Sequence, residues 1–373
     1  MIKFTYITVL SLLVFLLSGC VKSDNNNKLE ENDMIIAAKL FKVLSNNALE
    51  NQIVIMKNLK INQLYVRPEQ ALKSGSPEIL DEANIDLWLI APIFYNDENQ
   101  DISPTPRWAV CDNGEIAQEK SENGNWLKMV CPNDTNYLDY RISYLEDVLS
   151  MCKFKGISLD FIRYFVFWEE VFEDTPSETL HNSCFCDACI NCFKEYLQLP
   201  AIQGDNIKDK TDFIIKNYFD EWTDFKCAVI SENVEKIISR LRQKNPFLEV
   251  NLHAVPWTKS DFNGSIRSIV GQDFSILSNK LTLLTPMVYS KMLRRNGQWI
   301  NDLVKSLHEE CNGKVKVIPA IQCKSVYGES FNDGDFEDIL KNAVKSPSSG
   351  VSIWPFEDLT DEKIKIIEQA LRR

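Results

Sequence analysis

Eight short apolar runs alternate with helical segments from residue 34 to the C-terminal end, and this alternation restricts the fold more than any other feature. The run at 85–95 is apolar almost throughout, as a strand buried on both faces should be. Eight strand–helix units that end in a helix are the pattern of a TIM barrel. We therefore predict an α/β fold, a (β/α)8 TIM barrel with long insertions after strands three and four.

The strands and helices of this barrel are predicted from apolar periodicity and from the turn residues between the runs. The strands are expected at residues 34–41, 61–67, 85–95, 156–164, 248–256, 281–289, 315–321 and 351–356. The helices are expected at 47–59, 77–83, 136–152, 211–244, 264–279, 297–311, 336–344 and 360–371. The main alternative, a doubly wound open sheet, would need a glycine-rich phosphate loop after an early strand, and the sequence has none.

The first twenty residues have the features of a bacterial lipoprotein signal. Lys3 supplies a positive charge, residues 7–17 form an apolar run, and Leu17-Ser18-Gly19-Cys20 is typical of a lipobox, where the chain is cut and the cysteine acylated. The run is shorter than the roughly 20 residues that span a bilayer, so we expect it to be removed. An ordinary secretory signal is the alternative. The chain then divides into a signal peptide at 1–19, a lipidated Cys20 with a flexible tether at 20–33, and the barrel at 34–373.

Cys20 is the only membrane attachment that we expect, and a lipid-held barrel would lie in water outside the cytoplasm. Val21 stands where an aspartate is associated with inner-membrane retention, which favours the outer membrane. The net charge of −12 argues against nucleic acid as a partner.

The residues at the predicted strand ends are rich in aromatic rings and carboxylates. In a TIM barrel the active site lies at these C-terminal strand ends. Aromatic faces stack on sugar rings and polar groups bind hydroxyls, so this composition predicts a carbohydrate site. The residues that we expect to contact substrate are Arg67, Glu69, Tyr95, Arg163, His253, Tyr289, Trp354 and Glu357.

Asp160 is the candidate for the principal catalytic carboxylate. Strand alternation places Ser158 and Asp160 on one face, so Asp160 would point into the barrel near its rim. A carboxylate there needs partners or a function. The alternative is a structural ion pair with a neighbouring arginine. Arg163 falls on the opposite face unless the strand has already ended.

Glycoside hydrolysis normally uses two carboxyl groups. Glu169, in the segment after strand four, is our candidate for the second, ahead of Glu357 and Glu69. His253 is either a buried core histidine or a substrate contact, and Tyr289 and Trp354 are either barrel packing or sugar platforms.

A dense cysteine cluster follows strand four, with the spacing Cys184-x-Cys186-x2-Cys189-x2-Cys192. Such spacing suits a structural zinc site, with His181 or another residue able to supply the fourth ligand. Disulfides to more distant cysteines are the alternative, since they persist outside the cytoplasm. We expect no cofactor for catalysis itself.

Several segments together resemble glycoside-hydrolase-like TIM-barrel proteins among exported bacterial polysaccharide-handling proteins. The similar segments are 126–133, 156–164, 167–169, 184–189 with Phe193, and 285–289. The resemblance implies cleavage of poly- or oligosaccharide and matches Asp160 to the family's strand-four aspartate. Strand five offers His253 where an amylase-like barrel has a glutamate, which departs from that mechanism.

Two other functions remain open from the sequence. One is a non-catalytic carbohydrate-binding lipoprotein on the same scaffold. The other is a different hydrolase, such as a deacetylase, which would need a catalytic metal or an activated serine. Neither H-E-x-x-H nor G-x-S-x-G occurs in the chain.

Overall fold

The computed structural model describes residues 34–95 and 105–371. The signal peptide, Cys20 and the tether, which we predict at 1–33, lie outside the described residues. The chain divides into a unit at 1–34 and a compact unit at 35–373, and the fold below is that of the second unit.

Nine parallel strands form one sheet in the described part of the chain. They are β1 (Ile35–Lys39), β2 (Gln63–Val66), β3 (Asp86–Pro92), β4 (Gly156–Asp160), β5 (Glu249–Ala254), β6 (Leu283–Pro286), β7 (Lys316–Val317), β8 (Ala320–Gln322) and β9 (Gly350–Trp354). Their order is β7-β6-β5-β4-β3-β2-β1-β9-β8. Neighbours in this order are neighbours in sequence except where β1 pairs with β9.

The two ends of this strand order are consecutive in the chain. Only Ile318 and Pro319 separate β7 from β8, and proline has no N–H to donate to a ladder. Ile318 N donates to Leu284 O of β6 at 2.9 Å, and Ser352 N of β9 donates to Pro319 O at 2.9 Å. One extended segment thus contacts both β6 and β9, so the sheet curls round until its edges meet, as in a TIM barrel.

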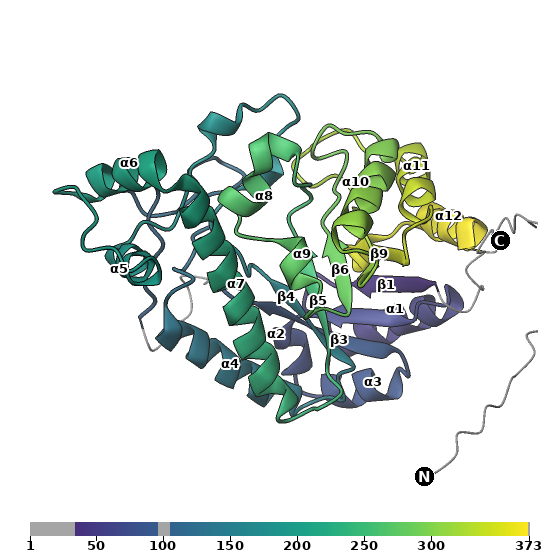
Figure 1. Ribbon diagram of the computed structural model, residues 1–373. Coiled ribbons are helices and arrows are strands. Elements are labelled where there is room, and N and C mark those ends of the chain that lie inside the picture. The colour runs from purple at the N-terminus through teal and green to yellow at the C-terminus, as the bar shows by residue number, and fades with distance from the viewer. Residues whose placement is uncertain (1–33, 96–104, 372–373) are drawn as a thin grey trace, which may run out of the picture. The chain divides into compact units, whose positions relative to one another are not determined.

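Helices surround this sheet (Figure 1). Those between successive strands, or after the last, are α1 (Asn46–Asn58), α3 (Ser76–Glu82), α4 (Thr135–Leu149), α7 (Phe219–Arg242), α10 (Gly297–Glu310), α11 (Asp333–Ala343) and α12 (Asp361–Leu371). Side-chain caps begin several of them, with Ser45 accepting from Ala48 N and Asp134 from Tyr137 N. No helix of the described residues has the length and apolar character needed to cross a membrane.

Part of the barrel interior is apolar. Ile35, Tyr65, Trp88 and Leu283 belong to one buried cluster, and the rings of Tyr65 and Trp88 stack at 5.4 Å. A Cβ at Gly156 would overlap the Trp88 ring, so the small residue that opens β4 is set by this packing. Lys39, Asp160 and Gln322, by contrast, are the last residues of β1, β4 and β8.

Two predicted helices are wrong in their extent. The helix expected at 211–244 is broken at Tyr218, where φ is −143°, into α6 (Ile207–Asn217) and α7. The helix expected at 264–279 is two single turns, α8 (Ser265–Ser268) and α9 (Phe274–Leu277). Gly271, with φ +76°, lies between them, and a left-handed residue ends a helix.

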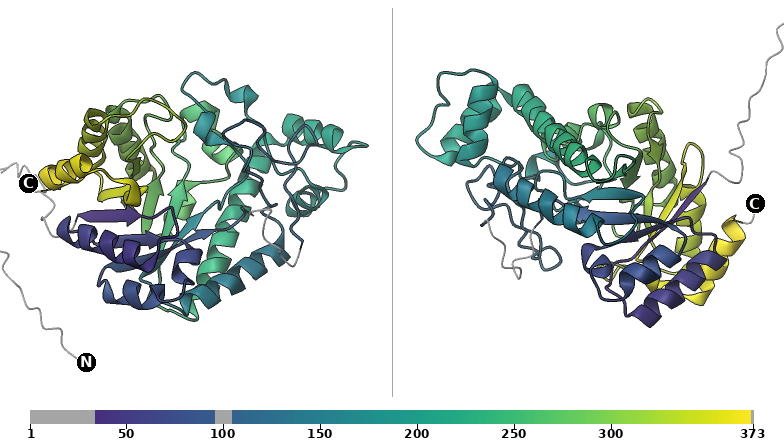
Figure 2. Two further views of the ribbon diagram at one scale, coloured as in Figure 1. Left: turned by 180° about the vertical axis from the view of Figure 1, so that it is seen from behind. Right: turned by 90° about the horizontal axis from the view of Figure 1, so that it is seen from below.

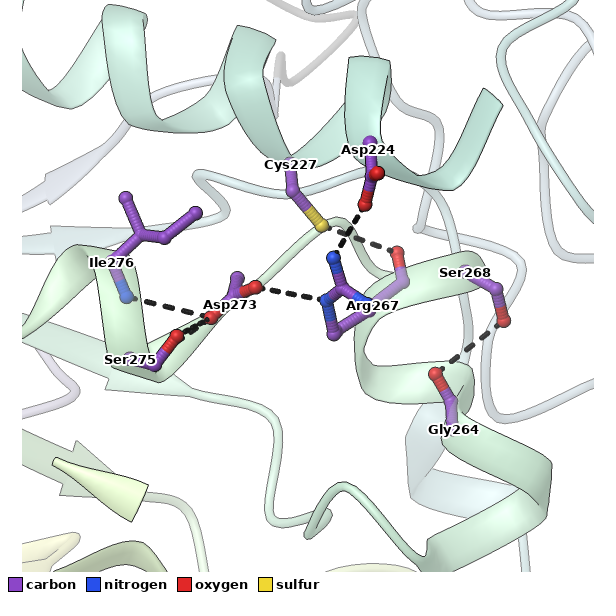
Figure 3. A network of polar contacts seen from close by, with 8 residues as sticks. All are labelled: Asp224, Cys227, Gly264, Arg267, Ser268, Asp273, Ser275 and Ile276. Carbon is purple, nitrogen blue, oxygen red and sulfur yellow. Dashed lines mark hydrogen bonds and ion pairs between the residues drawn. The ribbon is translucent and has the colours of Figure 1, made fainter. Parts of the chain in front are cut away.

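Polar contacts hold these single turns against α7 (Figure 3). Arg267 donates to Asp273 at 2.8 Å and to Asp224 of α7 at 2.6 Å. Asp273 also caps α9 by accepting from Ser275 N and Ile276 N. The periodicity predicted one continuous helix, and side-chain contacts between two single turns and α7 take its place.

The segments that follow β3 and β4 pair with each other. The antiparallel bridge of Cys111 with Ser183 joins them, whereas the bridges of Trp108 with Val130 and of Val110 with Ile116 lie within the segment after β3. Helix α5 (Asp187–Tyr196), which the sequence analysis missed, belongs to the second segment. Helices α5 and α6 lie apart from the strands in all three views (Figures 1 and 2).

Candidate active site

Asp160 is the last residue of β4, four residues earlier than the predicted end of that strand. The strand ends there because Phe161 adopts φ +50°, a left-handed conformation uncommon for a bulky side chain. Phe161 N donates to Asp160 Oδ1 at 2.9 Å, which stabilises the turn. The Asp160 side chain keeps 15% of its surface exposed, so a ligand can reach it.

Arg163 lies on the same side as the carboxyl groups because the strand has ended before it. Its guanidinium is buried and donates to Tyr164 O at 3.1 Å and Val166 O at 2.9 Å. Burial lowers the pKa of Arg163, and the charges of Glu169 and Asp160 oppose that shift. One cation therefore interacts electrostatically with both candidate acids.

Glu169 lies in a 3-10 turn, Trp168–Glu170, beside this pair. Its Oε2 atom is buried and has no hydrogen-bond partner among the described residues. Burial raises the pKa of Glu169 to about 7, although the charge of Arg163 lowers it in part. An unpartnered acid with this pKa can be protonated near neutral pH and then donate its proton.

His253 of β5 belongs to a buried hydrogen-bonded chain inside the barrel. Thr285 Oγ1 donates to Asn251 Oδ1 at 2.9 Å, and Asn251 Nδ2 donates to Ser158 Oγ at 2.8 Å. Ser158 Oγ lies 3.0 Å from His253 Nδ1, and the ring tautomer decides which of the two atoms donates. Burial lowers the pKa of His253 well below the usual value, so the ring is neutral.

Lys39, at the end of β1, is a buried cation that the sequence analysis missed. Burial lowers the pKa of Lys39, while the charge of Asp160 raises it. His253 Nδ1 lies 3.9 Å from Asp160 Oδ2, so the histidine, the lysine and the aspartate form one polar layer. The position of Lys39 near the end of the first predicted strand, 34–41, was the available signal.

Aromatic rings form two groups on the βα loops around these acids. Tyr289 stacks on Trp354 at 4.7 Å, and Phe41 meets Trp354 edge-on at 5.6 Å. Tyr95 stacks on Phe161 at 4.9 Å in the second group. That group also contains Trp126, Phe167 and Tyr327.

Three predicted contact residues lie in the β1–β2 part of the rim. Glu357 accepts from Phe41 N at 3.0 Å and Lys42 N at 2.7 Å, so its carboxylate holds the loop after β1. Glu69 pairs with Arg67 at 3.1 Å, and both side chains are exposed. Neither glutamate has the buried surroundings of Glu169.

The structure brings together Cys184, Cys186 and Cys189 with Cys131, which precedes α4. Cys192, the fourth cysteine of the predicted set, lies outside this group, half-buried on α5. His181, the other residue considered for the fourth ligand, lies 3.3 Å from Asp112. The cysteine that completes the group is therefore distant in sequence.

No protein-family model and no curated protein matches the sequence. Solved structures of glycoside hydrolases do resemble its fold. The PgaB (BpsB) glycoside hydrolase domain from Bordetella bronchiseptica has a TM-score of 0.66 at 12% identity, over 90% of this chain and 98% of its own. The β-galactosidase from the psychrophilic Marinomonas ef1 has a TM-score of 0.62 at 8% identity, over 91% and 59%.

The GH42 β-galactosidase Gan42B from G. stearothermophilus has a TM-score of 0.59 at 9% identity, over 91% of this chain and 56% of its own. The chain thus spans less than two thirds of the two β-galactosidases and nearly all of the Bordetella domain. Similarity at these identities shows the fold alone, and so confirms the TIM barrel of the predicted fold class.

Proposed function

We propose that this protein hydrolyses glycosidic bonds of poly- or oligosaccharides, with Glu169 as the proton donor and Asp160 as the catalytic carboxylate. The observation that carries the proposal is the difference between the two carboxyl groups. Glu169 Oε2 has no hydrogen-bond partner in the described part of the chain, and burial raises the pKa of Glu169 to about 7, whereas Asp160 accepts a backbone hydrogen bond at the strand end. Two carboxyls in unlike surroundings suit acid and base roles in glycosidases.

In the reaction, Glu169 gives its proton to the oxygen of the scissile bond while the bond from that oxygen to the sugar carbon breaks. Asp160 acts on the positive charge that develops at this carbon, either by bonding to it or by taking a proton from the attacking water. Arg163, held by two backbone carbonyls, stabilises the glutamate anion left after proton transfer. Product anomers followed by NMR distinguish the two roles of Asp160.

The substrate class follows from the rim. Rings from several βα loops surround the acids, and Trp126 and Phe41 are 40% and 50% exposed. Exposed aromatic faces offer stacking surfaces for sugar rings, and the acidic chain offers little to a polyanion. A neutral or basic glycan therefore fits better than a strongly anionic one.

The location is part of the same proposal. We infer that Cys20 carries the lipid and that the barrel acts outside the cytoplasm, with attachment to the outer membrane favoured by Val21. Extracellular glycans would then be its natural targets.

A polysaccharide panel assayed for new reducing ends tests the proposal. Wild-type protein is expected to release sugar, and both Asp160→Asn and Glu169→Gln are expected to reduce kcat by roughly 10³-fold or more. Glu170→Gln is the matched control, because the Glu170 carboxylate is next to Glu169 in sequence but accepts a hydrogen bond from Asn123 Nδ2 at 2.8 Å.

The alternative is a carbohydrate-binding protein without catalysis. The observation that favours it is His253 near the end of β5, where an amylase-like barrel has a glutamate. Glycan binding of similar affinity in wild type and Asp160→Asn, with no product from either protein, would establish that alternative and reject hydrolysis.

A further inference from the structure

Four buried cysteines lie together beside the barrel. One sulfur atom from each of Cys131, Cys184, Cys186 and Cys189 is within 4.8 Å of the other three. Cys131 Sγ is 3.5 Å from Cys186 Sγ and 3.4 Å from Cys189 Sγ. Four thiolates around a tetrahedral zinc at about 2.3 Å lie about 3.8 Å from one another. A disulfide requires about 2.05 Å, and the cysteines of the described residues are all free.

The surroundings of these sulfurs favour thiolates. Cys186 is the N-cap of α5 and Cys189 lies in its first turn, where the helix presents positive partial charge. Val110 N donates to Cys184 Sγ at 3.3 Å, and Asn133 Nδ2 donates to Cys189 Sγ at 3.1 Å. Such N–H donors orient thiolate ligands and tune their basicity.

Two cations compensate the charge that such a centre would carry. Four thiols that bind one zinc ion release four protons, which leaves a net charge of −2 on the group. Arg107 interacts electrostatically with Cys131 and Cys186. Burial lowers the pKa of Lys226 on α7, the charges of Cys184 and Cys189 oppose that shift, and its ammonium donates to Asn182 Oδ1 at 2.6 Å.

We propose that Cys131, Cys184, Cys186 and Cys189 bind one zinc ion in a closed, structural site. Four protein ligands leave no open position for water, so the ion takes no part in catalysis. Cys131 comes from the segment after β3, and the other three come from the segment after β4. The ion therefore joins two irregular segments that also meet at the Cys111–Ser183 bridge and at the hydrogen bond from Phe185 N to Val110 O.

The site also fixes the far end of the segment that carries Glu169. That segment begins at Asp160 and reaches the cluster at Cys184, and Phe165 N donates to Ser183 Oγ at 3.2 Å between them. Loss of the ion is expected to loosen the support of Glu169 while the barrel strands stay paired. This consequence for activity rests on the proposed function, whereas the metal site does not.

Metal content measured by mass spectrometry tests the site. Purified protein, incubated with zinc chloride and desalted, is expected to hold one zinc per chain. Cys131→Ser and Cys189→Ser are expected to lose it, and Cys192→Ser, on the same helix but outside the cluster, is expected to keep it. Zinc retained by Cys131→Ser, or bound equally weakly by all variants, would overturn the proposal.

A second measurement serves if the ligand variants fail to fold. Wild-type protein with cobalt in place of zinc is expected to show the charge-transfer absorption of a tetrahedral thiolate centre. Non-reduced peptide mapping of the wild type is expected to find no disulfide among the four cysteines. A disulfide that joins any two of them, with no metal bound, would refute the site whatever the activity.

Discussion

At the scale of single residues, Glu169 and Asp160 show how position sets the chemistry of a carboxyl group. Glu169 lies in a turn that buries its Oε2 atom with no donor from residues 34–95 or 105–371, whereas Asp160 ends a strand and accepts a hydrogen bond from a backbone N–H. Arg163 interacts with both groups. The positions of these three residues lead to a pH dependence that can be measured.

We expect kcat/KM to fall as pH rises through about 7, because Glu169 must be protonated to donate its proton. Arg163→Gln removes a charge that lowers the pKa of Glu169, so the fall should move to higher pH. A pH–rate profile of both proteins tests this. An unchanged profile in the variant would show that another group controls the fall.

The raised pKa of Glu169 also affects stability. Between its ordinary value of 4.5 and about 7, the folded protein holds a proton that the unfolded chain releases. The free energy of unfolding should therefore decrease as pH rises through this window. Urea denaturation of wild type and Glu169→Gln across the window should give curves that diverge, and parallel curves would contradict the burial of an unpartnered acid.

The exposed rings lead to a prediction about binding. Trp126→Ala should raise KM roughly 5-fold with kcat little changed, since an aromatic contact is worth about 1 kcal/mol. Phe247→Ala is the control, because that ring is 89% exposed and precedes β5, at the opposite end of the strands. Equal effects from both variants would argue against a sugar-stacking role of Trp126.

The residues that sequence could identify were those whose environment is local. Asp160 follows from strand alternation, but the side on which Arg163 lies depends on the left-handed Phe161, which no propensity predicts. The cysteine spacing indicates a cluster, but Cys131 joins it through tertiary folding and Cys192, although closer in sequence, does not. The spacing within a short segment cannot identify a partner that is distant in sequence.

At the scale of elements, the connection between β5 and β6 depends on side chains more than on helical hydrogen bonds. The single turns α8 and α9 are too short to be stable alone. Arg267 joins them to α7 through Asp273 and Asp224 (Figure 3). The apolar period at 264–279 reports which side is buried, but it does not reveal the left-handed Gly271 that interrupts the helix.

Arg267→Ala should lower the free energy of unfolding by roughly 1 kcal/mol, a small value because the side chain is 38% exposed. Asp224→Ala should cost less, since Asp224 is 60% exposed and Arg267 keeps Asp273. Urea denaturation compares the two. A larger loss in Asp224→Ala would reverse the importance that we assign to these contacts.

At the scale of the whole molecule, the order of the strands was predictable because each strand pairs with its neighbour in sequence, apart from the closing pair. The break at Pro319, which divides one predicted strand into β7 and β8, was harder to predict from the sequence. It depends on how a tilted strand meets both of its neighbours.

The lipid attachment is a prediction about the whole chain. Cys20→Ser should move the protein from the membrane fraction to the soluble fraction, because one acylated residue is the attachment that we infer. Immunoblots of fractionated cells measure this, with Cys192→Ser as the control. A Cys20→Ser protein that stays with the membrane would contradict the lipobox.

The pairing of β1 with β9 has a consequence for how the protein is made. Ile35 lies opposite Gly350, so the ring of strands cannot close until the chain has been synthesised as far as β9. Until then β1 has an unpaired edge, which is a template for pairing with other chains. A product truncated before β9 would keep that edge permanently. In the cell, this product would be prone to aggregation and to proteolysis.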